Sequence, residues 1–138
     1  MNMSSTGQIT PLSGEARAGN RIFRRLFERV IELYGHTTPV GEVFIRMITD
    51  FHWREGEQVT VTGLAARYGF PRTTVARVIA ALIEEGRARE VIDADDRRRR
   101  LLVPTETGVA SASAWGEWIE VAIRDEQTMR EGRRSLLR

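Results

Sequence analysis

Residues 62–108 have the sequence TGLAARYGFPRTTVARVIAALIEEGRAREVIDADDRRRRLLVPTETG. Apolar residues first recur at helical spacing, in two segments separated by a Gly-Phe-Pro turn at 69–71. Gly86 ends the second segment, and two short runs of β-branched and leucine residues then flank a charged stretch, Asp95 to Arg100. The pattern predicts a short helix, a turn, a helix over 72–85, and a hairpin with strands near 89–92 and 101–103.

The helix expected over 72–85 leaves an informative outer face. Its inward positions are Val75, Val78, Ile79, Leu82 and Ile83. The outward positions are Arg72, Thr73, Ala76, Arg77 and Ala80, with no acid before Glu84. Small side chains and guanidinium groups suit a helix that enters a DNA major groove ~12 Å wide, and the positive end of the helix dipole at Arg72 favours a phosphate. An ordinary amphipathic helix with a solvated face is the alternative.

The flanking segments predict further helices. Residues 1–14 are rich in Ser, Thr and Gly and predict a flexible tail, followed by a helix over 15–34. The next helix, over 40–54, carries Val40, Phe44, Met47, Ile48 and Phe51 on one face. A short strand is expected at 59–61, with Thr62 as the cap of the following helix, and Thr105 is expected to cap the last helix. Residues 132–138 are expected to fray.

The composition limits the class of protein. A chain of 138 residues predicts one domain, and the absence of cysteine excludes disulfides and thiolate-bound metals. No apolar run approaches the ~20 residues that cross a bilayer, so we expect a cytoplasmic protein without membrane contact. The net charge is only +2, but all 21 basic residues are arginine, whose guanidinium can contact phosphates or guanine edges through two donors.

No catalytic or metal-binding constellation is visible. His36 and His52 have no metal-ligand spacing and no nucleophile motif beside them, so each is expected to be a surface or capping histidine. No glycine-rich loop follows a strand. We therefore expect neither enzyme activity, nor a metal, nor a cofactor.

Residues 61–108 resemble the winged helix-turn-helix of MarR-type transcriptional regulators. The matching residues are Leu64-Ala65 in the first motif helix, Thr74-Val75-Ala76-Arg77 in the second, Leu82 to Gly86 at its end, Asp96-Arg97-Arg98 in the hairpin, and Thr105 to Gly108. Three positions depart from the pattern: Arg87 and Ala88 stand where the family has two apolar residues, and Pro104 stands where it has leucine. We expect these departures to loosen the base of the hairpin, with Arg87 free for a phosphate.

The resemblance implies a mainly α fold with a small β-hairpin, a winged helix-turn-helix flanked by dimerisation helices. The implied division is a single domain over 15–138, with N-terminal helices at 15–56, the winged helix-turn-helix at 57–108, and a C-terminal dimerisation helix with a frayed end at 109–138. The implied function is sequence-specific recognition of double-stranded DNA.

The resemblance also implies roles for single residues. The recognition helix would lie in the major groove, with Arg72, Thr73, Thr74 and Arg77 nearest to bases or phosphates. In the wing, Asp96 would orient Arg98 for the minor groove, while Arg97, Arg99 and Arg100 would contact phosphates or water. A winged-helix module that binds an acidic protein partner is the alternative function.

A homodimer has an independent argument. The helix at 15–34 and the last helix carry more apolar surface than a winged motif can cover, and a symmetric pairing would set two recognition helices ~34 Å apart. The expected interface comprises Phe23, Leu26, Phe27, Val30, Trp115, Trp118 and Ile119. Packing within one chain is the alternative. Trp53, Trp115 and Trp118 could line a pocket for a small aromatic effector. The alternative is that they simply pack in the core or at the dimer interface.

Overall fold

The structure is a computed structural model and describes residues 7–10, 13–35 and 37–137. The elements are α1 (Gly14–Tyr34), α2 (Val40–Arg54), α3 (Val61–Tyr68), α4 (Arg72–Glu84), β1 (Ala88–Ile92), β2 (Arg100–Pro104) and α5 (Glu106–Leu136). The order of helices and hairpin is the one the sequence predicts.

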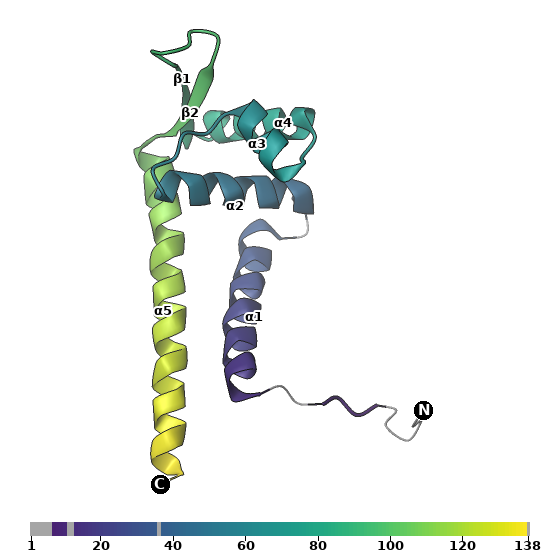
Figure 1. Cartoon of the computed structure of the whole chain (residues 1–138), viewed down its shortest axis with the longest axis vertical. Coiled ribbons are helices and arrows are strands. Elements are labelled where there is room, and N and C mark those ends of the chain that lie inside the picture. Colours follow the sequence, from purple (N-terminus) through teal and green to yellow (C-terminus); the bar gives the residue numbers. More distant parts are fainter. Residues whose placement is uncertain (1–6, 11–12, 36, 138) are drawn as a thin grey trace.

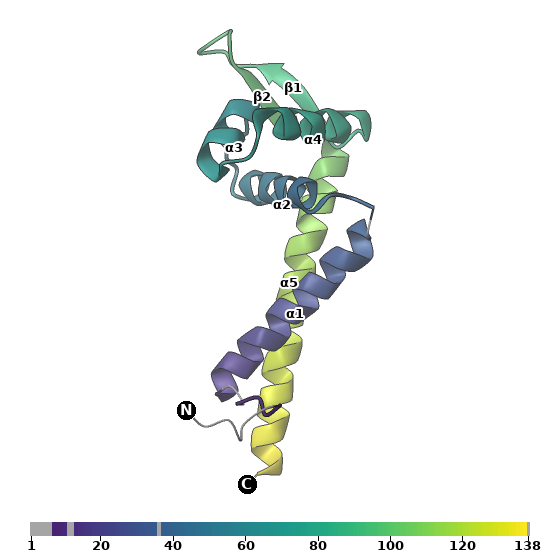
Figure 2. The same cartoon turned by 90° about the vertical axis from the view of Figure 1, so that its right-hand side faces the viewer.

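The elements form two halves (Figure 1). Helices α2, α3 and α4 and the hairpin make one half, which we call the winged half. The long helices α1 and α5 make the other, the helical half, and Figure 2 shows α1 crossing α5 along its length. The hairpin projects from the winged half, and the far end of α5 lies at the opposite end of the molecule (Figure 1).

One apolar core holds the winged half together. Its buried members are Ile45, Val59, Leu64, Val75, Val78, Ile79, Leu82, Ala88 and Leu102. The hairpin joins this core because β1 and β2 pair antiparallel from Ala88↔Pro104 to Ile92↔Arg100, and Leu102 also forms an isolated bridge with Val59. Helix α4 and the hairpin base therefore share one packed interior.

Side-chain caps set three of the helix starts. The hydroxyls of Ser13, Thr60 and Thr105 accept hydrogen bonds from the N–H groups of Ala16, Gly63 and Gly108. The expected cap at Thr62 and the expected strand at 59–61 are therefore wrong. The pairing of Val59 with Leu102 holds residue 59 extended, and α3 begins directly after Thr60.

The face of α2 that is buried is not the face that carries its largest apolar side chains. Val40, Phe44 and Phe51 are 66%, 45% and 42% exposed. The buried residues are Val43, Ile45, Thr49 and His52, because α2 lies between α4 and α5 and is packed from both sides. On α4, Ile83 is also more exposed, at 36%, than its apolar character predicts.

Helix α5 continues to Leu136, so the expectation of a frayed end over 132–137 is wrong for the residues described. Arg21 Nε lies 2.9 Å from Glu126 Oε1, and Arg25 Nη1 lies 3.2 Å from Asp125 Oδ2, so both pairs fasten α5 to α1. Beyond them, Arg, Glu and Leu favour helix enough to tolerate the single Gly132. Among the described residues, no helix is both long and apolar enough to cross a membrane.

Candidate nucleic-acid interface

The outer face of α4 has the composition that the sequence predicts. Arg72, Thr73 and Arg77 are exposed, while Thr74 is half-buried. Pro71 provides no side-chain cap, and the first turn contains no acid. Because a helix start leaves its first N–H groups without partners inside the helix, the start of α4 presents donors and the positive end of a dipole.

The hairpin tip is held by its own acids. The Asp93 carboxylate accepts a hydrogen bond from the Asp95 N–H at 2.9 Å, and the Asp93 N–H donates to the Arg99 carbonyl at 3.0 Å. The Asp96 carboxylate accepts from the backbone N–H of Arg98 at 3.0 Å. Asp96 therefore orients the backbone of the tip, and the expected contact between Asp96 and the Arg98 guanidinium is replaced by this backbone hydrogen bond.

A hollow of about 590 Å³ separates the hairpin from the starts of α3 and α4. Its basic lining residues are Arg72, Arg98, Arg99 and Arg100, and its other lining residues include Thr60, Thr62, Gly63, Glu90 and Asp96. A smaller hollow nearby, of about 130 Å³, is lined by Arg67 and Arg99 together with the start of α3. The structure thus brings Arg72, Asp96, Arg98 and Arg99 to one concave surface, while Thr73, Thr74, Arg77 and Arg97 do not line it.

The sequence does not predict that the start of α3 lies at this surface or that Arg67 lines the smaller hollow. The available signal was the pair of threonines at 60 and 62, which identifies a helix start but not what it faces. The sequence predicts that Arg100 contacts phosphates or water, whereas in the structure its Nη1 lies 3.3 Å from Glu90 Oε2 across the hairpin.

Arg77 has a partner on another helix. Its Nε lies 3.0 Å from Oε1 of Glu42, in the first turn of α2. The Arg77 side chain is 67% exposed and that of Glu42 is 22% exposed. Arg77 is therefore accessible, but a carboxylate that sequence spacing could not predict restricts where it can lie.

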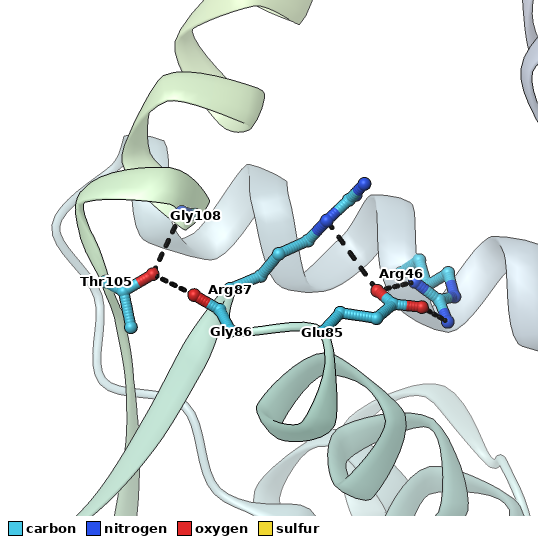
Figure 3. Close-up of polar contacts among 6 residues, drawn as sticks. All are labelled: Arg46, Glu85, Gly86, Arg87, Thr105 and Gly108. Carbon is cyan, nitrogen blue, oxygen red and sulfur yellow. Dashed lines mark hydrogen bonds and ion pairs between the residues drawn. The ribbon is translucent and has the colours of Figure 1, made fainter.

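A polar joint connects the end of α4 to the start of α5 (Figure 3). The Thr105 hydroxyl donates to the Gly86 carbonyl at 2.6 Å and accepts from the Gly108 N–H at 3.2 Å. A Cβ at Gly108 would lie 2.0 Å from the Arg87 carbonyl oxygen, so only glycine allows this approach. These contacts fix the base of the hairpin to α5. Ala88 is buried, with 3% of its surface exposed, so the prediction that Arg87-Ala88 loosens the packing of the hairpin base is wrong.

Charged groups surround this joint on the side of α2. The Arg46 guanidinium bonds both oxygens of Glu85 at 2.9 Å, which raises the pKa of Arg46 and lowers that of Glu85. Arg87 Nε lies 3.6 Å from the same carboxylate (Figure 3). Burial raises the pKa of the nearby Asp50 carboxyl to about 6, against the opposing charges of Arg54, Arg87 and Arg46. Arg87 thus belongs to this inner cluster and not to the surface beside the hairpin.

The prediction that His52 is a surface or capping histidine is wrong. His52 is buried, with Nδ1 2.6 Å from Glu57 Oε2 and Nε2 2.7 Å from the Tyr68 hydroxyl. His36 lies outside the described residues. In the part of the chain that the structure describes, no cluster of three or more His, Asp or Glu side chains could hold a metal ion.

The tryptophans separate into two environments. Trp53 packs against the core of the winged half, and its Nε1 donates to the Leu102 carbonyl at 3.3 Å. Trp115 and Trp118 pack edge to face, 6.1 Å between ring centroids, and line a hollow of about 320 Å³. That hollow lies between α1 and α5, and Arg29, Tyr34 and Arg87 also line it.

The residues expected at a dimer interface lie on α1 and α5. Phe23 and Phe27 are 62% and 50% exposed. The others, Leu26, Val30, Trp115, Trp118 and Ile119, are half-buried in the single chain.

Solved structures with the same arrangement of elements include three informative ones. The S. aureus MepR–DNA complex has a TM-score of 0.58 and 16% identity over 91% of this chain and 97% of that one. Wild-type apo MarR from E. coli has a TM-score of 0.57 and 16% identity over 90% and 87%. The transcriptional repressor CouR, bound to a 23-mer DNA duplex, has a TM-score of 0.54 and 19% identity over 99% and 93%.

No protein-family model matches the sequence, and the curated proteins contain no match either. At identities of this size the likeness concerns the fold, and it confirms the resemblance that the motifs predict. The chain has the winged helix-turn-helix fold of the MarR-type regulators.

Proposed function

We propose that the chain is a transcriptional regulator that binds double-stranded DNA sequence-specifically as a homodimer. The observation that carries the proposal is the concave surface at which Arg72 of α4 and Arg98 and Arg99 of the hairpin meet. A duplex against this surface would receive α4 in its major groove and the hairpin arginines in the adjacent minor groove, whose negative potential attracts guanidinium. Such a regulator acts where the chromosome lies, in the cytoplasm, and needs no catalytic group.

Roles follow for the individual side chains. Arg77, exposed on the second turn of α4, is proposed to read base edges, with Thr73 and Thr74 beside it. Arg72 lies at the start of α4, where N–H donors and the helix dipole also favour a phosphate. Arg97 and Arg99, on the exposed tip, are proposed phosphate contacts, and Asp96 keeps the tip in shape by binding the Arg98 N–H.

The homodimer is proposed from the exposed apolar surface of α1 and α5. Phe23 and Phe27 follow each other at helical spacing, with 5.4 Å between their ring centroids, and both face water in the single chain. A second copy that covers this face removes apolar surface from water and gives the two recognition helices a two-fold relation. DNA half-sites about one helical turn apart are then expected.

A small aromatic effector is a secondary proposal. The hollow beside Trp115 and Trp118 combines aromatic walls with Arg29, Tyr34 and Arg87, a lining that suits an aromatic anion. Because Arg87 also belongs to the joint between α4 and α5, an occupant there would act on the position of the recognition helix.

The salt dependence of duplex binding tests the DNA-binding proposal. If six or more phosphates are neutralised, affinity should fall about a thousandfold between 50 and 200 mM salt. A flat response would instead favour the alternative, a winged-helix module for an acidic protein partner.

Two arginine variants separate base reading from phosphate contact. We expect Arg77→Ala to reduce the preference for the selected duplex by about 1–3 kcal/mol, and Arg99→Ala to weaken all duplexes alike and to reduce the salt slope by about one. The measurement is a titration of each variant with selected and random duplexes of equal length. Equal losses on both duplexes for both variants would contradict the assigned roles.

A further inference from the structure

We infer that Glu42 of α2 is a specificity-determining residue, which positions Arg77 for base recognition by pairing with it across the α2–α4 contact. The inference rests on the proposed DNA-binding function and extends the recognition surface to a helix outside the helix-turn-helix. It begins from the pair itself, in which Arg77 Nε lies 3.0 Å from Glu42 Oε1.

The geometry gives Glu42 a fixed place and leaves Arg77 accessible. Glu42 lies in the first turn of α2, with a side chain only 22% exposed, and α2 packs directly against α4. The Arg77 side chain is 67% exposed. Because the contact engages Nε, the nitrogen nearest the main chain, the Nη end of the guanidinium can still meet a second acceptor.

Neighbouring charges leave the Glu42 carboxylate to Arg77. The other arginine near Glu42 is Arg46, one turn along α2, and its two Nη groups already bond both oxygens of Glu85 at 2.9 Å. Glu42 raises the pKa of Arg46 less than Glu85 and Tyr34 do, and its ion-pair partner among the described residues is Arg77.

The consequence differs for correct and incorrect DNA. An arginine free to rotate loses conformational entropy when it docks on one base edge, and a carboxylate that already restricts it lowers that cost. Random duplexes, held through phosphates, need no single arginine position and gain nothing from the restriction. The Glu42 charge also repels phosphates of any sequence. Glu42 should therefore increase the ratio of specific to random binding without increasing the affinity for random duplexes.

The test is a comparison of Glu42→Gln with the wild-type full-length chain. The probes are a duplex selected by the wild-type chain from a random pool and a random-sequence duplex of equal length, at one salt concentration. We expect the ratio of the two affinities to fall about two- to fivefold, the effect of a partly exposed ion pair. The affinity for random duplex should stay equal or increase, because one negative charge is lost.

Two further variants show whether the effect passes through Arg77. Glu55→Gln changes the same charge at the other end of α2, where Glu55 is exposed and makes no ion pair among the described residues, so the ratio should not change. In an Arg77→Ala background, Glu42→Gln should have no further effect on the ratio. Unchanged melting temperatures check that every variant is folded.

The outcomes distinguish the inference from the function beneath it. A wild-type chain that prefers the selected duplex, with the same ratio for Glu42→Gln, would overturn the role of Glu42 and leave the DNA-binding proposal intact. The role of Glu42 would also be overturned if Glu55→Gln lowered the ratio as much as Glu42→Gln does. The same holds if Glu42→Gln lowered the ratio equally in the Arg77→Ala background. A wild-type chain that selects no duplex would overturn both.

Discussion

In the winged half, Ile45, Val75 and Val78 are 0–2% exposed, whereas in the helical half Phe23 and Phe27 are 62% and 50% exposed. The residues that α1 and α5 do bury are the small Ala18, Gly108, Ala112 and Ala122, together with the paired Glu126. One half is thus closed around its own large side chains, while the other brings two helices together through small ones. The difference teaches that the winged half has a large-residue core of its own, whereas the helical half keeps an exposed apolar face, which the proposed second copy would cover.

The largest expected effect is a loss of dimerisation when the exposed apolar face of the helical half is changed. Replacing Phe23 and Phe27 together by Ser should weaken dimerisation by about 2–4 kcal/mol, the range for aromatic anchors of an interface. The winged half should keep its secondary structure, because neither side chain belongs to its core. Sedimentation equilibrium measures the dimer constant.

Arg24→Ala is the matched control for this pair of substitutions. Arg24 lies on the same helix and its side chain is 77% exposed in a pair with Glu28, so it should have little effect. A wild-type chain that sediments as a monomer, or an unchanged constant in the double variant, would contradict the proposed interface.

The next effect concerns the joint between the halves. Gly108→Ala brings a Cβ to 2.0 Å from the Arg87 carbonyl oxygen, a backbone atom that cannot move alone, so α5 must shift from the hairpin base. We expect a loss of about 1–3 kcal/mol in the free energy of unfolding, read from urea denaturation at fixed protein concentration. Gly132→Ala, on the same helix with nothing within 4 Å, should instead be neutral or slightly stabilising. Equal stability of the two variants would show that the close approach is not a constraint.

The last effect, similar in size to that of Gly108→Ala, sharpens the comparison through pH. Because burial raises the pKa of Asp50 to about 6 from 3.8, the folded chain binds a proton there more tightly than the unfolded chain does. The resulting stabilisation is complete below about pH 4 and is lost as pH rises through about 6. Asp50→Asn, which mimics the neutral acid, should therefore be more stable than the wild type at pH 7 by about 1–3 kcal/mol.

The acids with opposite shifts lie in a lower pH range. The pKa values of Glu85 and Glu126 are lowered by hydrogen bonds from Arg46 and Arg21, so their contributions are lost as pH falls below about 4.5. The wild type and Asp50→Asn lose this stabilisation equally. The stability difference between Asp50→Asn and the wild type should thus shrink steadily from pH 7 to 4, and a difference constant across this range would refute the assignment.

Local sequence signals predicted the elements whose limits depend on local chemistry. Thr105 caps α5 as expected, Gly86 follows α4, and Val75, Val78 and Leu82 point inward. The pattern was insufficient where a distant residue decides. Thr60 starts α3 because Val59 pairs with Leu102. Helix α2 buries Thr49 and His52 because other helices pack against it on two sides.

The site followed the same rule. Arg72, Arg98 and Arg99 could be named from their order in the motif, and they line one hollow. Glu42 could not be named, since its contact with Arg77 joins two helices that sequence spacing does not relate. The bond predicted for Asp96 was wrong, because a short carboxylate reaches the N–H two residues on more readily than the guanidinium.

The most direct measurement is the selection of bound duplexes from a random pool by the full-length chain. If α4 lies in the major groove with the hairpin beside it in a two-fold dimer, the recovered duplexes should share a palindrome whose half-sites are centred about 10 base pairs apart. Recovery of duplexes with no common sequence, or of a single half-site without symmetry, would contradict the account.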